Sequence, residues 1–193
     1  SSTPRTSVML LKLSDLLSYM LYECDRSTVP LEKEIEMMKE YMQLEKIRYN
    51  DEPEIQVNIK GEPGNKMIAP FLLLPFIENS FKQSNGIEQP WINMDIRVEG
   101  DDFSMKLTNG IAESLADQSF LNTNGFANVQ KRLSLLYPGI HELKMTTEQE
   151  MFIVFLNIRL TDNAAFAVEE EEIDFDVAKN RKTTEPVLKY ASD

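Results

Sequence analysis

Three polar side chains adjoin the most hydrophobic segment of the chain, "LLLPFIENSFKQSNG" (residues 72–86). Glu78 and Asn79 directly follow the apolar run, and Lys82 comes three residues after Asn79. Residues at i and i+3 project from the same side of a helix, so Asn79 and Lys82 can address one ligand. The pattern suggests phosphate chemistry, with the Asn79 carboxamide oxygen on Mg²⁺, Lys82 on a phosphate and Glu78 as general base. Mg²⁺ prefers oxygen ligands and takes few from the protein when phosphates and waters complete its shell.

The structural alternative is a core helix whose three polar side chains merely face water, and this segment alone does not exclude it. Other chemistries have less support. The sequence contains no Cys/His cluster with zinc-site spacing and no Gly-x-Ser-x-Gly motif. Its single histidine, His141, is interpreted as an ordinary surface or edge-strand residue.

The composition narrows the class of protein. A net charge of -12 over 193 residues argues against nucleic acid, because binding to phosphate backbones requires clustered Lys and Arg. The same charge disfavours an anionic membrane surface. One cysteine, Cys24, cannot form an internal disulfide and is typical of a reducing compartment. No stretch approaches the roughly 18 consecutive apolar residues of a membrane span, so we expect a soluble segment, which can still come from a membrane protein.

The spacing of hydrophobic residues predicts an α+β fold. We expect helices at 8–24 and 31–49, a strand at 54–60, a helix at 70–83, two strands around Gly100-Asp101, an irregular segment at 111–123, a helix at 124–137 and two strands within 141–160. Strands joined by hairpins, with helices gathered on one face, form an α+β sandwich. The chain therefore divides into a helical hairpin at 1–50, a sandwich at 51–161 and an acidic and polar tail at 162–193.

The two N-terminal helices carry wide apolar stripes. The stripes are Leu10, Leu13 and Leu17 on the first helix and Ile35, Met38 and Met42 on the second. Such stripes have more than one face to bury, so two hairpins could pair into a four-helix bundle and make a homodimer. The acidic residues at the start of the second helix, Glu34 among them, are interpreted as complements to that helix's own dipole.

The segment "IAPFLLLPFIENSFK" resembles the asparagine-containing box of sensor histidine kinases of the LytS-type branch. Those kinases belong to the ATPase superfamily that also holds gyrase, Hsp90 and MutL. Upstream, "VPLEKEIEMMKEYMQLEKIRY" resembles that branch's linker after its phosphoacceptor helix. Downstream, "NGFANVQKRLSLLYPG" resembles the second glycine box and its following helix. The resemblance runs from residue 9 to about residue 160, with the motifs in the family's order.

The resemblance implies a Bergerat-type sandwich, a mixed sheet covered by helices on one face, that binds ATP and Mg²⁺. Asn79 would hold the metal, Lys82 would lie near the phosphates, and Glu78 would be the candidate general base. Residues 111–124 would form a lid over the nucleotide. The remaining nucleotide-binding positions implied by the family's glycine boxes are Thr108, Asn109, Gly110, Gly125 and Asn128. A response regulator would be the partner, and the chain would be a cytoplasmic segment of an inner-membrane sensor, with the membrane regions outside it.

The sequence departs from the family pattern at several positions. The box continues with Lys82-Gln83-Ser84 where the family has Lys-His-Gly. Thr108 and Asn109 stand where the family presents an Asp to the adenine amino group, and Thr123 replaces the first glycine of the second box. The phosphoacceptor of an Asn-Pro-His motif is expected upstream of this chain.

Two functions follow from the matches and the departures. The first is the catalytic, ATP-binding part of a histidine kinase that phosphorylates the upstream histidine. The second is a degenerate interaction module that keeps the fold and the dimer helices but binds nucleotide weakly or not at all.

Overall fold

The computed structural model of the chain describes residues 3–23, 25–49, 53–84, 86–111 and 124–162, and every structural statement below concerns these residues. The chain divides into two compact units, Ser1–Thr161 and Asp162–Asp193. Apart from Asp162, the predicted tail lies outside the described residues.

The first unit contains the predicted elements in the predicted order. They are α1 (Thr3–Glu23), β1 (Val29–Pro30), α2 (Leu31–Arg48), β2 (Glu54–Lys60), β3 (Lys66–Ile68), α3 (Leu74–Ser84), β4 (Trp91–Glu99), β5 (Asp102–Gly110), α4 (Asn124–Leu136), β6 (His141–Glu148) and β7 (Met151–Arg159), with β8 (Thr161–Asp162) at the boundary of the unit. The short strands β1, β3 and β8 were not predicted. Two-residue and three-residue strands such as these carry too little alternation to be recognised in a sequence.

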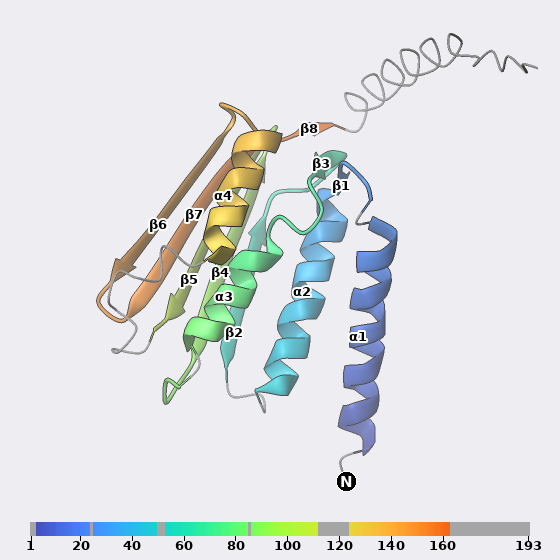
Figure 1. Cartoon of the computed structure of the whole chain (residues 1–193), viewed down its shortest axis with the longest axis vertical. Helices are drawn as coiled ribbons and strands as arrows, with labels where there is room; N and C mark the ends of the chain where they lie inside the picture. The colour runs from blue at the N-terminus through green and yellow to red at the C-terminus, as the bar shows by residue number, and fades with distance from the viewer. Residues whose placement is uncertain (1–2, 24, 50–52, 85, 112–123, 163–193) are drawn as a thin grey trace, which may run out of the picture. The chain divides into compact units, whose positions relative to one another are not determined.

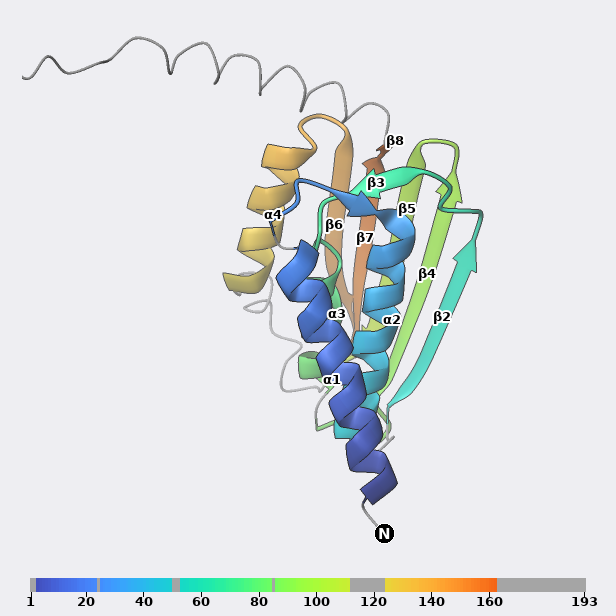
Figure 2. The same cartoon turned by 90° about the vertical axis from the view of Figure 1, so that its right-hand side faces the viewer.

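Five strands form a mixed sheet in the order β2-β4-β5-β7-β6. β2 and β4 are parallel, whereas the β4–β5, β5–β7 and β7–β6 pairs are antiparallel. Helices α2, α3 and α4 cover one face of this sheet and leave the other face bare (Figures 1 and 2). The predicted α+β sandwich, with helices on one face, is confirmed.

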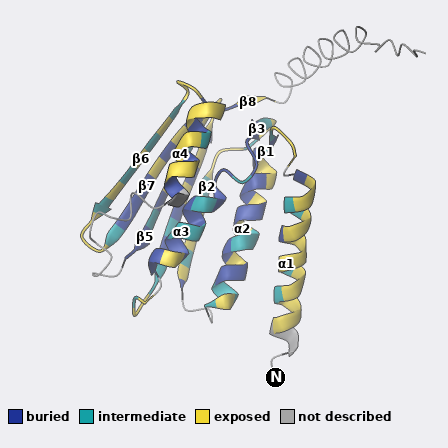
Figure 3. Ribbon diagram, viewed as in Figure 1, coloured by how far each residue is buried: buried dark blue, intermediate teal, exposed yellow. Residues whose placement is uncertain are grey.

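The core lies between the sheet and these three helices. Alternate residues of β4, β5 and β7 point toward the helices and are buried, among them Ile92, Phe103 and Leu156. α2 contributes Leu31 and Met38 to the same core. Burying each such side chain contributes about 1.5–3 kcal/mol, and the helix faces toward the sheet are accordingly buried (Figure 3).

α1 differs from the other helices because it packs on α2 on the side away from the sheet (Figure 2). A small separate cluster fixes its inner side and consists of Leu16 of α1, Met37 and Leu44 of α2, and Leu74 of α3. Lys12 also reaches Glu40 of α2 at 2.5 Å. Most of the remaining apolar surface of α1 is open, with Leu10 61% and Leu21 75% exposed. The helical hairpin is therefore present, but all three residues of the α1 stripe, Leu10, Leu13 and Leu17, are at least 40% exposed.

One tight turn between β2 and β3 depends on glycine. Gly61 has a φ of +85°, and a Cβ built there would lie 2.0 Å from the Val98 carbonyl oxygen. No side chain fits at that distance, so the chain passes from β2 over the end of β4 only because this residue has none.

Candidate functional site

α3 carries the polar triplet that the sequence singled out. Pro75 is accommodated in its first turn, where a missing N–H costs nothing. Phe76, Ile77 and Phe81 are buried against the sheet and fix the rotation of the helix. That rotation leaves Glu78 and Asn79 half-buried and Lys82 exposed.

Asn79 does not simply face water. Among the described residues, four buried side-chain atoms lack a hydrogen-bond partner: Glu23 Oε2, Glu45 Oε2, Asn79 Nδ2 and Asn109 Oδ1. The two glutamate oxygens have arginine ion-pair partners at 2.9 and 2.6 Å. Only the two asparagines therefore hold buried amide atoms without any partner. Each such atom costs about 1–3 kcal/mol, which a bound ligand would recover.

Asn109 is completely buried at the end of β5, on the face covered by α3. Its Nδ2 donates to the Gln83 Oε1 at 3.2 Å and to the Gly110 carbonyl at 2.9 Å. Ser84 Oγ donates to the same Gly110 carbonyl at 3.0 Å. Both Asn109 donors are thus used, and the amide presents its acceptor oxygen, Oδ1, to whatever occupies the neighbouring space.

Gln83 and Ser84 have roles that the sequence did not reveal. They stand where the family has His-Gly and looked like losses, yet both are buried and bind the end of β5. Gln83 lies one helical turn after Asn79 and on the same side of α3. A departure in one segment that complements Asn109 in another can be seen only when the two segments are brought together in space.

Thr108 does not join this group. Its cross-strand partners are Asn93 and Ile153, whereas Asn109 is paired with Ile92 and Phe152 on the helix-covered face. Successive strand residues point to opposite faces, so Thr108 lies on the bare face of the sheet. Of these two residues, only Asn109 is therefore placed so that its side chain can reach the helices.

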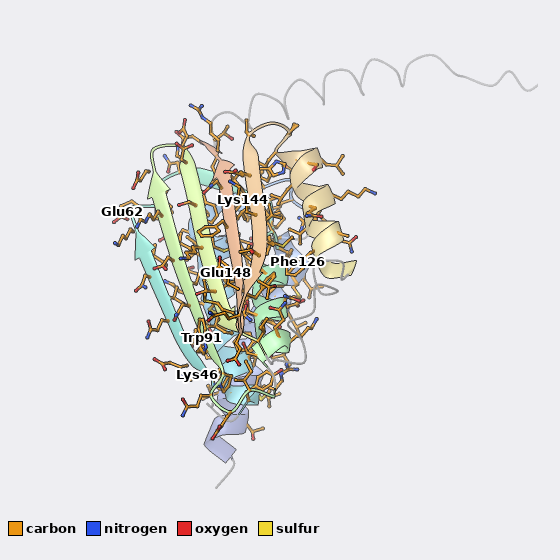
Figure 4. All side chains as sticks on the ribbon, turned by 90° about the vertical axis from the view of Figure 1, so that its left-hand side faces the viewer. Lys46, Glu62, Trp91, Phe126, Lys144 and Glu148 are labelled. Atoms are coloured by element: carbon orange, nitrogen blue, oxygen red, sulfur yellow. The ribbon has the colours of Figure 1, made fainter. Side chains whose placement is uncertain are left out.

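Gly110 is required by its surroundings on that bare face. A Cβ on Gly110 would lie 2.8 Å from Trp91 Nε1, and Trp91 lies at the end of the sheet where β4 begins (Figure 4). The glycine therefore lets the indole close over the strand end whose carbonyl holds Ser84 and Asn109.

The start of α4 lies beside α3. Phe126 packs between α4 and the sheet (Figure 4), with its ring 6.0 Å from Phe76 of α3 and 5.7 Å from Phe152. Gly125 is the second residue of α4, and Asn128, one turn on, is exposed. Of the predicted lid at 111–124, residues 112–123, including Thr123, lie outside the described residues. Ile111 at one end donates its N–H to the Glu150 carbonyl at 2.8 Å, and Asn124 at the other end begins α4.

The charges around α3 set the metal chemistry that is possible. Burial raises the pKa of Tyr41 on α2, and the carboxylates of Glu45 and Glu78 raise it further, so Glu78 lies toward α2. Among the residues that the structure describes, no group of three His, Cys, Asp or Glu side chains is placed to hold a metal. A metal at Asn79 would therefore depend on oxygen atoms of a ligand, which is the coordination typical of Mg²⁺ with phosphates.

α3 is positioned by a turn at residues 69–73, the "69–73 turn", immediately before it. Glu34 of α2 is fully buried and accepts hydrogen bonds from the backbone N–H groups of Phe71 (3.1 Å) and Leu73 (3.2 Å). These donors lie at the N-terminus of α3, where N–H groups have no partner within the helix and negative charge is favourable. Glu34 therefore caps α3, a role that its place among the acidic residues in the first turn of α2 did not reveal.

The same turn is held from the other side by α4. Arg132 donates to the carbonyl oxygens of Pro70 at 2.8 Å and Phe71 at 3.1 Å. The Tyr137 hydroxyl, just after α4, accepts a hydrogen bond from the Ala69 backbone N–H at 2.7 Å. Burial raises the pKa of both Glu34 and Tyr137 above their ordinary values. One short turn thus fixes α3 and α4 relative to each other.

Comparison with known proteins places these features in a family context. A family model described as histidine kinase matches residues 1–53. The sensor protein LytS of Staphylococcus epidermidis is 28% identical over 156 residues, which cover 73% of this chain and 26% of that protein. The sensor histidine kinase/phosphatase LytS of Staphylococcus aureus is 25% identical over 142 residues, covering 68% and 24%. The chain spans about a quarter of the length of these relatives.

Solved structures share the fold. The histidine kinase AdeS of Acinetobacter baumannii aligns with a TM-score of 0.52 at 10% identity, over 79% of this chain and 77% of that one. The histidine kinase ThkA, solved in complex with the response regulator protein TrrA, aligns with a TM-score of 0.51 at 14% identity, over 79% and 48%. At these identities the likeness establishes the fold, and it confirms the expected ATPase-type sandwich.

Proposed function

We propose, from the premise that this chain is a LytS-type sensor histidine kinase core, that it is the ATP-binding catalytic part of a two-component sensor. It would transfer the γ-phosphoryl group of ATP to a histidine outside this chain. The observation that carries the proposal is the pair of buried, unpartnered amide atoms, Asn79 Nδ2 on α3 and Asn109 Oδ1 on β5. They are linked through Gln83, which shares a helix face with Asn79 and binds Asn109.

Each residue of α3 has a part in the proposal. Asn79 would hold Mg²⁺ through its carboxamide oxygen, and its buried Nδ2, a hydrogen-bond donor, would bind a phosphate oxygen. Lys82, exposed three residues on, would reach a phosphate. Glu78 would accept the proton of the attacking group as general base. Bound Mg²⁺ would neutralise the triphosphate and so favour transfer of the phosphoryl group.

The other end of the nucleotide is assigned to β5. Asn109 Oδ1 would accept a hydrogen bond from the 6-amino group of adenine, with Gly110 allowing the strand end to stay compact. At the start of α4, Gly125 would let the backbone approach the phosphates, and Asn128 lies exposed one turn on. Thr108, on the bare face of the sheet, is not part of the proposed site.

The degenerate-module alternative rested on Gln83, Thr108 and Thr123. Gln83 is accounted for by its bond to Asn109. Thr108 faces away from the site, so it does not replace a nucleotide ligand. These two positions therefore give that alternative no support, and Thr123 lies outside the described residues.

The single histidine of the chain has a structural role. His141 Nδ1 is 2.6 Å from the Tyr137 carbonyl oxygen at the end of α4, which ties the ring to the helix. We therefore assign phosphate acceptance to a histidine of the longer protein and receipt of the phosphoryl group to a response regulator.

None of the described helices combines the length and hydrophobicity that crossing a membrane requires. We place the chain on the cytoplasmic side of an inner-membrane sensor whose membrane regions lie elsewhere.

Homodimerisation through α1 is the first testable part of the proposal. Leu10, on the open face of α1, is 61% exposed. We expect sedimentation to show a dimer that Leu10→Glu dissociates, because a charge in an apolar interface is costly. Leu135→Glu, on α4 at 68% exposure, is the matched control and should leave the dimer intact. A monomeric parent at high concentration, or equal effects of both variants, contradicts dimerisation through α1.

Asn79→Ala tests the metal and nucleotide site. In the parent chain, Mg-ATP at about 100 times its dissociation constant should stabilise the fold by about 2.7 kcal/mol in a melting experiment. Asn79→Ala should lose the Mg²⁺-dependent part of this shift while keeping the parent's circular dichroism spectrum. Asn93→Ala, which removes an asparagine from the bare face, should keep the full shift. The proposal fails if millimolar Mg-ATP shifts neither the parent nor Asn93→Ala.

Gln83→Met tests how the base is selected. In the parent, we expect Mg-ATP to bind about tenfold or more tightly than Mg-ITP. The 6-amino group of ATP can donate to Asn109 Oδ1, whereas the 6-oxo group of ITP places a second acceptor against that oxygen. Without the Gln83 acceptor, only the Gly110 carbonyl holds the orientation of the Asn109 amide, so the ratio of the two dissociation constants, measured by calorimetry, should fall toward one. Gln56→Met on the exposed side of β2 should keep the parent's ratio. An unchanged ratio in Gln83→Met would refute this role for Gln83.

A further inference from the structure

Phe71, at the centre of the 69–73 turn, has a backbone conformation that its side chain disfavours. Its φ is +56°, in the left-handed region, which costs a non-glycine residue roughly 1–2 kcal/mol. Such a conformation persists only when the surroundings fix it. Here Glu34 binds the Phe71 N–H from α2 and Arg132 binds the Phe71 carbonyl from α4.

α1 reaches the same turn through Tyr19. The Tyr19 hydroxyl donates to Glu34 Oε2 at 3.0 Å, the oxygen that also accepts the Phe71 N–H. The Tyr19 ring meets the Phe71 ring edge-on, with centroids 5.2 Å apart and planes at 81°. Burial, helped by the nearby Glu34 carboxylate, raises the pKa of Tyr19, so its hydroxyl stays a donor at neutral pH. One side chain of α1 thus contacts both the carboxylate and the residue that it restrains.

These contacts link a loosely held helix to the proposed site. α1 has a largely open outer face, whereas α2, α3 and α4 share the main core. The 69–73 turn runs directly into α3, which carries Asn79 and Gln83. The hydrogen bonds of Arg132 connect the same turn to α4. A shift of α1 along α2 would withdraw Tyr19 from both Glu34 and Phe71, without breaking the main core.

We propose that Tyr19 and Glu34 are positioning residues that couple the placement of α1 to the affinity of the nucleotide site, acting through the 69–73 turn. This inference rests on the proposed nucleotide function. With Tyr19 engaged, the turn holds α3 in the position at which Asn79 of α3 and Asn109 of β5 address one ligand. With Tyr19 withdrawn, only a fraction of molecules has that arrangement, and the apparent affinity falls by that fraction.

Coupling of this kind is reciprocal. If α1 in place strengthens nucleotide binding, bound nucleotide must hold α1 in place by the same factor. A purely structural role for Tyr19 would lower the stability of the fold but leave the affinity of the folded molecules unchanged. The two roles are therefore distinguished by measuring folded protein only.

The test compares Tyr19→Phe with Tyr22→Phe, which removes the same hydroxyl from a residue of α1 that is 78% exposed. The dissociation constant for Mg-ATP is measured by calorimetry at a temperature where circular dichroism shows every variant fully folded. We expect Tyr19→Phe to bind about three- to tenfold more weakly than the parent, as the loss of one hydrogen bond to a carboxylate allows. Tyr22→Phe should bind as the parent does.

Limited trypsin digestion gives the reciprocal readout, through cleavage after Lys12 of α1. Mg-ATP should slow this cleavage in the parent and in Tyr22→Phe, and should have no effect on it in Tyr19→Phe. Equal affinities in the two variants, with equal protection of Lys12, overturn the coupling while leaving the proposed nucleotide function standing. A parent that binds no Mg-ATP overturns the proposed function and the coupling with it.

Discussion

A carboxylate that is removed from water must be hydrogen-bonded, and the way Glu34 meets this requirement organises the molecule. Its oxygens accept from the backbone of Phe71 and Leu73 and from the Tyr19 hydroxyl, so three elements converge on one side chain. Breaking such a buried arrangement leaves uncompensated charge, which is strongly destabilising. The start of α3 is therefore tied to the N-terminal hairpin. The Arg132 bonds to the same turn extend the constraint to α4.

The second constraint is the alternation of side chains between the two faces of the sheet. Asn109 points under α3 because its neighbours across the strands are core residues, and Thr108 must then point to the bare face. Gln83 and the Gly110 carbonyl together use both Asn109 donors, and the Asn109 acceptor oxygen is left without a partner. An amide held in one orientation can accept a hydrogen bond from a donor group of a nucleobase, as a carboxylate would, although the bond to the neutral amide is weaker. Two of the departures from the family pattern, Gln83 and Asn109, thus contact each other.

The sequence was sufficient for the fold because the apolar spacing is regular in every long element, and the Glu78–Asn79–Lys82 pattern located the candidate site. It could not show which of the neighbouring residues Thr108 and Asn109 faces the helices until the strand pairing of β5 was known. It also missed Glu34, because an acidic residue in the first turn of a helix normally faces water. Contacts such as Glu34–Phe71 and Gln83–Asn109 join residues that are 37 and 26 positions apart. No local pattern records them.

The central claim is that the Glu34 carboxylate holds the turn that positions α3. Its most direct test is the hydrogen-exchange rate of individual backbone amides, measured by NMR for Glu34→Gln and for Glu36→Gln, whose parent residue is exposed. The account predicts slow exchange at Phe71 and Leu73 in the parent and in Glu36→Gln. In Glu34→Gln, exchange should be faster at both amides and along the first turn of α3, because a donor group replaces one acceptor oxygen. Unchanged rates at Phe71 and Leu73 in Glu34→Gln would contradict it.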